Sequence, residues 1–591
     1  MEQVKFLFTY VKRHKWQYIG GIITLFAVDF FNLMIPQITG VITDGLAGHT
    51  MGMEQVMQNL AKLIGLGTLL ALGRFLWRYF LFGAARHIQY EMRNGMFEKL
   101  ETMSVEYFNE HKTGDLMSRF TNDLNAVRMA IGMAVISAFD ATVMAVMVIG
   151  QMMYYVNVKL TLLAIIPMIF IAAGEFYYGR EMRRRFKEKQ EAVSDLTDQV
   201  QESISGIRVV KAFVQEKEEK EAFARANAYA REKNMAVARL GAVVMPLLDV
   251  VIGVSSLVTL LYGGYLAITG EITLGRFVAF NQYIGMLVWP MLAAGESITS
   301  LSQGLASTKR IQEIFDEKPE IFDDETAKPA GAIHGEITFD HLTFLHQGHC
   351  DPTLKDICLE VPAGTTLAIV GRTGNGKTTL VNLLLHLYNT QRGMIRIDGR
   401  DINSIPLKEL RENIAYVPQD NFLFSDTLRH NIAFGVEDEE RGEADPEAVE
   451  RAARAACVHD NIIAFPDGYD TIVGERGVTL SGGQKQRSSI ARALLKDAAI
   501  LILDDALSAV DTDTEKQILE NLRKNREGKT TILIAHRIST IQNADCIIVL
   551  ENGEIRERGN HEELMAQKGI YYEMFEKQQL EAGLTEGEVT V

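Results

Sequence analysis

Cysteine is scarce in this chain, and basic side chains do not outnumber acidic ones. Only Cys350, Cys358, Cys457 and Cys546 occur among 591 residues, and no two have CxxC spacing. This scarcity argues against a disulfide framework and a zinc site, and it fits a reduced cytosolic setting. The formal net charge of -16 gives no support to nucleic-acid binding, which needs a basic surface.

Length and composition divide the chain into two unlike halves. A chain of 591 residues is too long for one hydrophobic core, so at least two domains are expected. The mean hydropathy of +0.02 is an average of unlike parts. The first half has repeated long apolar runs, and the second alternates short apolar strands with Gly-rich turns and charged helices. We therefore predict a membrane all-α bundle fused to an α/β domain.

Six stretches reach the length of about 20 apolar residues that a helix needs to cross a bilayer. They lie near residues 19–41, 60–83, 128–155, 158–178, 240–268 and 274–303. The loop 42–57 has no Lys or Arg, whereas 84–127 and 179–239 are rich in both. The positive-inside rule then places these two long segments and both termini in the cytoplasm. Residues 1–18 show no cleavable signal and are expected to form an amphipathic lead-in helix on the membrane surface.

The two long cytoplasmic segments keep a helical pattern, so the spans are expected to continue well beyond the membrane. Each segment contains a break, near 107–116 and near 205–215. These breaks are either ordinary connections between helices or short transverse helices that dock onto a motor domain.

Ionisable side chains within a span are costly and usually face a bundle interior or a water-filled path. Asp29 and Asp249 are the candidates for a substrate or ion pathway. Structural pairing with Arg74 or Arg78, or a position at the interface, is the alternative for either.

A buried strand expected at 366–370 leads into a loop with the pattern GxxxxGK[ST] and then into a helix, the setting of a phosphate-binding loop. Its glycines let backbone N–H groups close around phosphate oxygens, and the helix N-terminus favours negative charge. We expect Lys377 to reach the β- and γ-phosphates and the Thr378 hydroxyl to ligate magnesium. The ATP-binding residues predicted here are Gly371, Thr373, Gly374, Asn375, Gly376, Lys377, Thr378 and Thr379.

A second apolar strand, expected at 500–503, ends in Asp504, a Walker B pattern whose carboxylate holds magnesium. Between the two motifs stands LSGGQ, at the start of a helix. Its predicted functional residues are Ser481, Gly482, Gly483 and Gln484.

These three motifs together resemble the ATP-binding cassette (ABC) family, in particular its exporters that fuse six spans to one cassette. The resemblance covers about residues 1–580 and implies the type I ABC exporter fold with ATP and Mg²⁺ as cofactors. It divides the chain into a transmembrane domain, a linker, a cassette and a flexible tail, at 19–310, 311–332, 333–580 and 581–591. A multi-pass protein of a bacterial cell membrane, with a cytoplasmic cassette, is expected.

The family pattern assigns further residues. Gln419 resembles the Q-loop glutamine, which touches magnesium, and His536 resembles the switch histidine that contacts the γ-phosphate. Residues 508–511 resemble the D-loop. His346 occupies the position that stacks on adenine, unless the loop is misaligned. The LSGGQ of one cassette is expected to clamp the ATP bound by another.

Asp505 departs from the family, which has glutamate there to orient the attacking water. The side chain is one carbon shorter, and we expect the backbone of a buried strand end not to compensate, so hydrolysis is expected to be slow. Heterodimeric exporters pair such a subunit with a non-identical one that has the acid. The alternative is a competent Asp505 in a homodimer.

The function implied is ATP-driven export of small amphipathic, drug-like molecules across the lipid bilayer by alternating access. A dedicated lipid or peptide exporter is one alternative, and an ATP-gated channel or transport regulator is the other.

Overall fold

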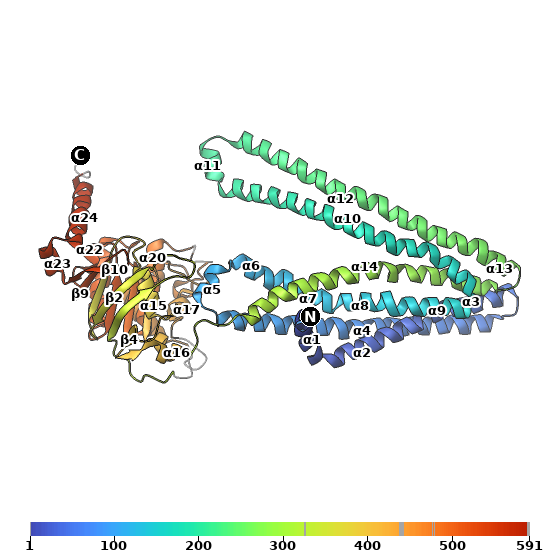
Figure 1. Ribbon diagram of the computed structural model, residues 1–591, viewed down its shortest axis with the longest axis horizontal. Coiled ribbons are helices and arrows are strands. Elements are labelled where there is room, and N and C mark those ends of the chain that lie inside the picture. The colour runs from blue at the N-terminus through green and yellow to red at the C-terminus, as the bar shows by residue number, and fades with distance from the viewer. Residues whose placement is uncertain (1, 324–326, 437–442, 475–476, 478, 588–591) are drawn as a thin grey trace. The chain divides into compact units, whose positions relative to one another are not determined.

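The computed structural model describes residues 2–323, 327–436, 443–474, 477 and 479–587. The chain forms two compact units, shown in Figure 1. The first unit contains residues 1–101 and 111–317, and the second contains residues 102–110 and 318–591.

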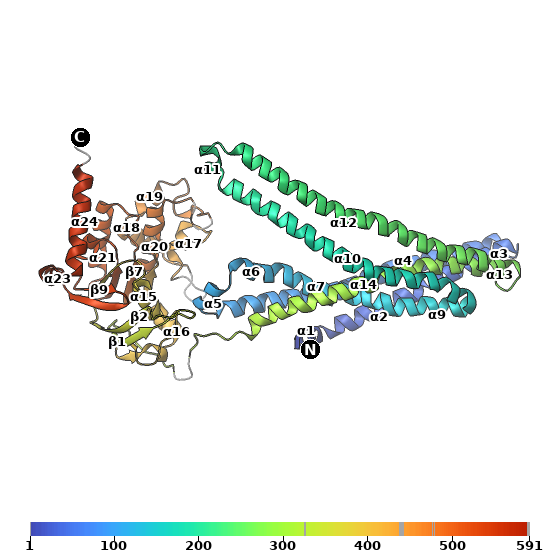
Figure 2. The ribbon, with the colours of Figure 1, turned by 45° about the horizontal axis from the view of Figure 1, so that its top comes forward.

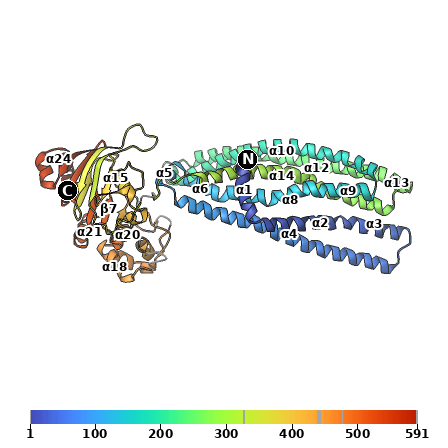
Figure 3. The same cartoon turned by 60° about the horizontal axis from the view of Figure 1, so that its bottom comes forward.

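Helices joined by short turns and loops make up the described part of the first unit, which contains no strand. Its α-helices are α1 (Glu2–Arg13), α2 (Lys15–Asn32), α3 (Met34–Ala47), α4 (Met53–Glu101), α6 (Thr113–Ser118), α7 (Leu124–Ile131), α8 (Met133–Phe139), α9 (Ala145–Tyr155), α10 (Val158–Ser205), α11 (Ile207–Ala212), α12 (Glu216–Val258), α13 (Gly264–Ile268) and α14 (Leu274–Asp316). Short π-helical turns join some of them, at Arg119–Asp123, Asp140–Met144 and Thr259–Gly263. Helices α2 and α4 lie side by side, and so do α10 and α12, which α11 connects (Figures 2 and 3).

Five helical segments are long and apolar enough to cross a membrane. They are Lys15–Ala47, Met53–Glu101, Thr113–Tyr155, Asp249–Ile268 and Leu274–Asp316. The fourth span expected from the sequence, 158–178, corresponds to the start of α10; Val158–Met168 is apolar, and the side chains of residues 169–177 lie outside the described part of the chain. Helices α4, α10, α12 and α14 are 43 to 49 residues long, so the spans do continue far beyond a bilayer.

Several boundaries differ from the sequence expectation. The lead-in helix α1 ends at Arg13 and α2 begins at Lys15, because the chain turns at His14 instead of near residue 18. Helix α14 continues to Asp316, inside the expected linker, since no proline or glycine stands there to end it earlier. Helix α24 (Ile570–Gly587) extends through most of the expected tail.

The outer ends of α3 and α14 approach each other closely. A Cβ on Gly40 would lie 2.8 Å from the carbonyl oxygen of Gly275, so only glycine fits there. Asp44 secures this contact, because its carboxylate accepts hydrogen bonds from Gly275 N and from the Thr273 hydroxyl, both at 2.6 Å. Thr273 in turn caps the first turn of α14.

The second unit is built on two sheets. The four-stranded sheet has the order β2-β1-β4-β5, with strands Ile337–Phe344 (β1), Leu354–Val361 (β2), Ile395–Ile397 (β4) and Arg400–Asp401 (β5). The six-stranded sheet has the order β10-β9-β3-β8-β7-β6, with strands Thr366–Val370 (β3), Ile414–Val417 (β6), Ile500–Asp504 (β7), Thr530–Ile534 (β8), Cys546–Glu551 (β9) and Glu554–Gly559 (β10).

Eleven α-helices accompany these sheets in the described part of the unit. They are α5 (Val105–Glu110), α15 (Lys377–Leu384), α16 (Leu407–Glu412), α17 (Leu428–Ala433), α18 (Pro446–Ala455), α19 (His459–Ile463), α20 (Gly482–Lys496), α21 (Thr512–Asn525), α22 (Ile538–Ile541), α23 (His561–Gln567) and α24. Short 3-10 turns lie at Ile402–Ser404 and Gly468–Asp470.

Strands β3, β6, β7, β8 and β9 run parallel at the centre of this unit. All residues of β7 and β8 are buried, which fits the apolar runs Ile500–Leu503 of β7 and Ile532–Ile534 of β8. In parallel strands the carboxyl ends meet at one edge of the sheet. The segments that follow β3, β6, β7 and β8 therefore gather there, the place where open α/β sheets bind ligands.

Candidate nucleotide-binding site

The loop after β3 wraps tightly around the lysine that follows it. Gly374 and Gly376 have φ values of 87° and 91°, a left-handed conformation that glycine adopts without strain. Lys377, the first residue of α15, is 7% exposed, and its Nζ donates to the carbonyl oxygens of Gly371 at 2.7 Å and Arg372 at 3.0 Å. Burial lowers the pKa of Lys377, and the nearby Asp504 and Asp505 oppose this shift. The loop thus has a buried ammonium group at its centre, placed for phosphate oxygens.

Asp504 is the last residue of β7 and lies deep in the sheet edge. Its side chain is 1% exposed, and its Oδ2 has no hydrogen-bond partner among the described residues. Burial raises the pKa of Asp504, while a hydrogen bond with Thr378 and the charge of Lys377 lower it. A buried carboxylate oxygen without a partner is costly unless it meets a cation. Asp504 and Thr378 therefore fit a magnesium ion, which would neutralise phosphate charge there.

Gln419, the third predicted magnesium contact, lies at the same edge of the sheet as these two residues. It stands two residues after β6, whose Val417 pairs with Leu503 of β7. Its side chain is exposed, and its backbone carbonyl accepts a bond from Asn421 Nδ2 at 3.4 Å. In the part of the chain that is described, no hydrogen bond links Gln419 to Asp504 or Thr378.

Asp505 follows the strand and turns sharply. Its φ is 47°, a left-handed conformation that is uncommon outside glycine but that Asp tolerates. Its N–H donates to Ile534 O at 2.9 Å, and its carbonyl accepts from the Ser508 hydroxyl at 3.0 Å and from Gln486 Nε2 at 3.4 Å. The expectation of a buried strand end was wrong in one respect, because β7 ends at Asp504 and Asp505 is only half-buried.

His536 follows β8 by two residues and is exposed. It lines two hollows on this edge. One, of about 180 Å³, is shared with Asp505, and the other, of about 670 Å³, is shared with the loop residues Gly371, Thr373 and Asn375. The structure thus brings the two predicted catalytic residues to one hollow and connects it to the phosphate loop.

His346 lies between β1 and β2, in a cluster of rings. Its ring centroid is 4.8 Å from that of Phe344 and 5.1 Å from that of Tyr388, and its Nε2 is 3.5 Å from the Thr379 hydroxyl. Burial lowers the pKa of His346, which favours the neutral ring. This ring therefore adjoins the phosphate loop, as an adenine contact requires. In the same unit, Asn109 of α5 donates to the Tyr388 hydroxyl at 3.5 Å.

The LSGGQ motif opens helix α20 through reciprocal capping. The Ser481 hydroxyl accepts from Gln484 N at 3.3 Å, and Gln484 Oε1 accepts from Ser481 N at 2.9 Å. Ser481 and Gly482 are exposed, so their side of the helix N-terminus is open to a ligand. A Cβ on Gly483 would lie 2.8 Å from the carbonyl oxygen of Ala509, so glycine permits the close packing of this turn on the D-loop.

Sequence reasoning missed Gln486, which connects this helix to the strand end. The side chain is 5% exposed; its amide group donates to Ser508 Oγ at 3.1 Å and to Asp505 O, and its Oε1 accepts from Ala509 N at 2.9 Å. The available signal was a long polar side chain among the buried positions of α20.

The two predicted pathway residues have different surroundings. Asp29 on α2 is buried, and its Oδ2 has no hydrogen-bond partner in the described chain. Asp140 and Arg74 are among the charged groups that act on it. Arg78 instead lies over the Trp77 ring, at 5.4 Å. Asp249 on α12 is exposed.

Both halves of the chain match family models. Residues 18–291 match the ABC transporter transmembrane region, and residues 354–508 match the ABC transporter model. A probable multidrug resistance ABC transporter ATP-binding/permease protein of Bacillus subtilis, YheI, is 39% identical over 582 residues, which cover 97% of this chain and 98% of that relative. The chain belongs to the ABC transporter family.

Two further comparisons refine this assignment. An ATP-dependent lipid A-core flippase of Syntrophus aciditrophicus is 39% identical over 490 residues, covering 83% of this exporter and 80% of the relative. A solved bacterial Atm1-family ABC exporter with ATP bound has a TM-score of 0.76 and 27% identity, and it covers 96% of this chain and 98% of its own. The chain is thus a membrane exporter of the type I fold that uses ATP and Mg²⁺, with ATP hydrolysis coupled to transport.

Proposed function

We propose that this chain is one subunit of a heterodimeric exporter and supplies its slow ATP site. The observation that carries the proposal is Asp505, at the position where the family has glutamate. The backbone at Asp505 is held by its bonds to Ile534, Ser508 and Gln486, so the reach of the carboxylate depends on side-chain length. A displacement of about 1 Å from the attacking water lowers the rate on the order of 10²-fold.

The other parts of the nucleotide site are intact, which supports a subunit specialised for binding ATP over one that has lost its function. Lys377 is seated in its loop, Asp504 and Thr378 fit magnesium, and His536 lines the hollow that Asp505 lines. The signature helix keeps its capping pair and its exposed N-terminus. This chain would thus bind ATP at its own site with little turnover, while Ser481, Gly482, Gly483 and Gln484 complete the hydrolytic site of a non-identical partner.

The pairing is tested by ATPase measurements on the purified chain, alone and co-expressed with exporter halves that have glutamate at the Walker B end. We expect low activity for the lone chain and a large increase with the correct partner. Vigorous hydrolysis by the lone chain would refute the proposal.

Side-chain reach is tested separately with Asp505→Glu and the matched control Asp505→Asn. We expect Asp505→Glu to raise hydrolysis at this site by up to about 10²-fold, because the carboxylate regains its reach. Asp505→Asn keeps the length and removes the charge, and it is expected to leave the low rate almost unchanged. A large loss in Asp505→Asn would mean that Asp505 is already a competent base.

For transport, we propose alternating access of amphipathic, drug-like substrates, with Asp29 and Asp249 on the substrate path and the segments 107–116 and 205–215 as coupling helices. The grouping of α5 with the cassette, and the bond from Asn109 to Tyr388, support the first coupling segment. The similarity to a multidrug protein supports drug-like substrates.

A lipid substrate is the second candidate, because the lipid A-core flippase is as similar over its matched length. Proteoliposomes separate the two. Uptake of a fluorescent dye against its gradient supports drug export, and ATP-dependent movement of a labelled lipid between leaflets supports lipid export.

A further inference from the structure

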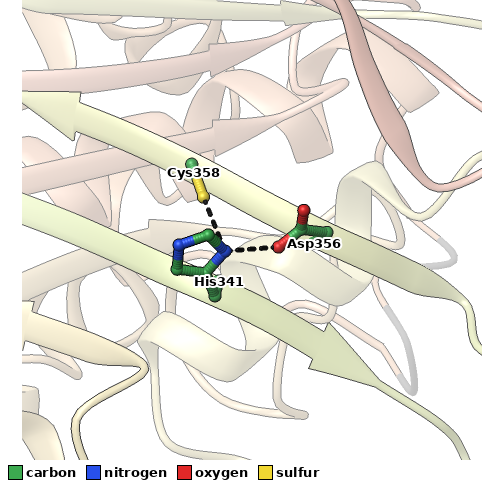
Figure 4. Close-up of side chains that lie close together, drawn as sticks. All are labelled: His341, Asp356 and Cys358. Carbon is green, nitrogen blue, oxygen red and sulfur yellow. Dashed lines mark hydrogen bonds and ion pairs between the residues drawn. The ribbon is translucent and has the colours of Figure 1, made fainter.

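Three side chains of potential metal ligands meet on the four-stranded sheet of the cassette, outside the site described above. They are His341 on β1 and Asp356 and Cys358 on β2 (Figure 4). His341 Nδ1 lies 2.6 Å from Asp356 Oδ1 and 3.4 Å from Cys358 Sγ. One ligand atom from each residue lies within 4.8 Å of the other two, and all three side chains are exposed. Solvent ions therefore have direct access to an imidazole nitrogen, a carboxylate and a thiol.

The register of β1 and β2 explains how residues so far apart in sequence meet. Phe339 pairs with Leu359, and Leu342 pairs with Ile357. Two residues of β1, Asp340 and His341, therefore lie opposite the single residue Cys358 of β2, and this two-against-one pairing is a β-bulge. A second register shift follows, between the Leu342 and Phe344 pairs, and it includes Asp356.

Both bulges hold a non-glycine residue in the left-handed conformation. His341 has a φ of 49° and Asp356 a φ of 50°. This conformation carries strain that persists only where the surroundings impose it, and bulges of this kind redirect side chains. The N–H of Asp356 donates to the Thr343 hydroxyl at 3.0 Å, which fixes its bulge. Asp356 and Cys358 are two residues apart on β2, so both point to the face that His341 reaches.

We propose that His341, Asp356 and Cys358 bind a divalent ion of the zinc class. Imidazole nitrogen, carboxylate oxygen and thiolate sulfur are the donors that zinc uses. Bonds of about 2.0–2.3 Å in a tetrahedral arrangement separate ligand atoms by about 3.3–3.6 Å. The distance from His341 Nδ1 to Cys358 Sγ already matches. The shorter distance of 2.6 Å between His341 Nδ1 and Asp356 Oδ1 is that of a hydrogen bond. It widens when the metal replaces the proton that these two atoms share.

Binding follows a simple proton balance. The Cys358 thiol loses its proton to solvent. The proton that His341 Nδ1 shares with Asp356 leaves Nδ1, either to solvent or to Nε2 of the same ring, so neutral His341 binds through Nδ1 and Asp356 binds as the carboxylate. Three protein ligands leave one position for water or for a group from another molecule. The scarcity of cysteine and the absence of CxxC spacing argued against a zinc site, and this proposal departs from that expectation because the set needs a single cysteine.

The test uses the full-length protein, purified in detergent with a tag that contains no histidine and titrated with Co²⁺ and then Zn²⁺. We expect one equivalent of Co²⁺ to produce a thiolate-to-cobalt charge-transfer absorption, which Zn²⁺ then abolishes. Because this absorption requires a thiolate ligand, binding to other histidines does not mimic it.

Three variants assign the site. Cys358→Ser is expected to remove the charge-transfer absorption, and His341→Asn, which tolerates the left-handed backbone, to weaken metal binding at least about tenfold. Cys350→Ser is the matched control, because Cys350 is an exposed cysteine of the same unit outside the cluster, and it is expected to behave as the unchanged protein. Absence of the absorption in the unchanged protein, its persistence in Cys358→Ser, or its loss in Cys350→Ser would overturn the proposal.

Discussion

Gln486 holds three parts of the nucleotide site together with a single side chain. Its amide bonds the carbonyl of Asp505, the hydroxyl of Ser508 and the N–H of Ala509. The signature helix, the Walker B end and the D-loop are thus connected through one buried group. In the proposed heterodimer, this connection links ATP bound at this chain's site to the signature loop that serves the partner.

We predict that Gln486→Ala lowers the ATPase of the heterodimer at least about tenfold, because it removes three part-buried hydrogen bonds, each worth about 0.5–1.5 kcal/mol, that fix the Walker B end and the D-loop on the signature helix. Steady-state hydrolysis at saturating ATP measures the effect. Ser488→Ala on the same helix is the control, since the buried Ser488 hydroxyl has no hydrogen-bond partner among the described residues and its loss is expected to be nearly neutral. Equal effects of the two changes would contradict the role of Gln486.

His386 predicts a pH dependence of cassette stability. It is 5% exposed, and burial lowers its pKa below the ordinary value of 6.5. As pH falls below about 6.5, the unfolded chain takes up a proton that the folded chain does not, so stability decreases by up to about 1.4 kcal/mol per pH unit.

His386→Asn tests this dependence, since asparagine does not titrate and tolerates the φ of 49° found there. We expect thermal unfolding midpoints between pH 5 and 7.5 to fall less steeply on acidification in the variant than in the unchanged protein. Parallel profiles would exclude His386 as the source.

At the scale of elements, the contact between α3 and α14 depends on two glycines. A Cβ on Gly275 would overlap the carbonyl oxygen of Gly40 and the carboxylate of Asp44. We predict that Gly275→Ala destabilises this contact by about 1–3 kcal/mol, the usual cost of overpacking, and lowers the thermal stability of the purified protein. Gly285→Ala is the control on the same helix, because a Cβ there meets nothing within 4 Å. A stability loss in both variants would point to a general intolerance of α14.

The elements that sequence predicted best are those that local chemistry defines. The strands at 366–370 and 500–503 were predicted because they are mostly apolar runs next to a glycine-rich loop or an acidic residue, and the structure has them as β3 and β7, with β7 extending to Asp504. The breaks near 107–116 and 205–215 were also found, as the short helices α5 and α11.

What sequence did not predict depends on backbone geometry or on distant pairing. The left-handed turn at Asp505 and the bulges at His341 and Asp356 depend on the neighbouring strands, and the residue types at these positions do not predict them. The link from Gln486 to Ser508 joins positions 22 residues apart through packing. The cysteine count argued against zinc, and the sequence did not reveal the cluster of His341, Asp356 and Cys358 because these residues come together only through the register of β1 and β2.

At the scale of the whole molecule, the proposed slow site predicts unequal nucleotides in the heterodimer. After one round of turnover with radiolabelled ATP, followed by rapid removal of free nucleotide, we expect intact ATP to remain on this chain and ADP on its partner. Photo-crosslinking the nucleotide and separating the two subunits identifies what each holds. Equal ADP on both would contradict the assignment of roles, whereas Asp505→Glu is expected to shift the nucleotide on this chain toward ADP.

The glycine contact near the start of α14 also means that a small rotation at this end of the helix produces a large movement at its other end. With Gly275 held against α3 through Asp44, the helix has a fixed point at one end and about 60 Å of length to its last residue, Asp316, at 1.5 Å per residue. A tilt of about 5° at the fixed point would move the far end by about 5 Å, close to one helical turn. A small rotation of α14 about its contact with α3 and a large displacement of its last residue, Asp316, are therefore the same motion measured at the two ends of the helix.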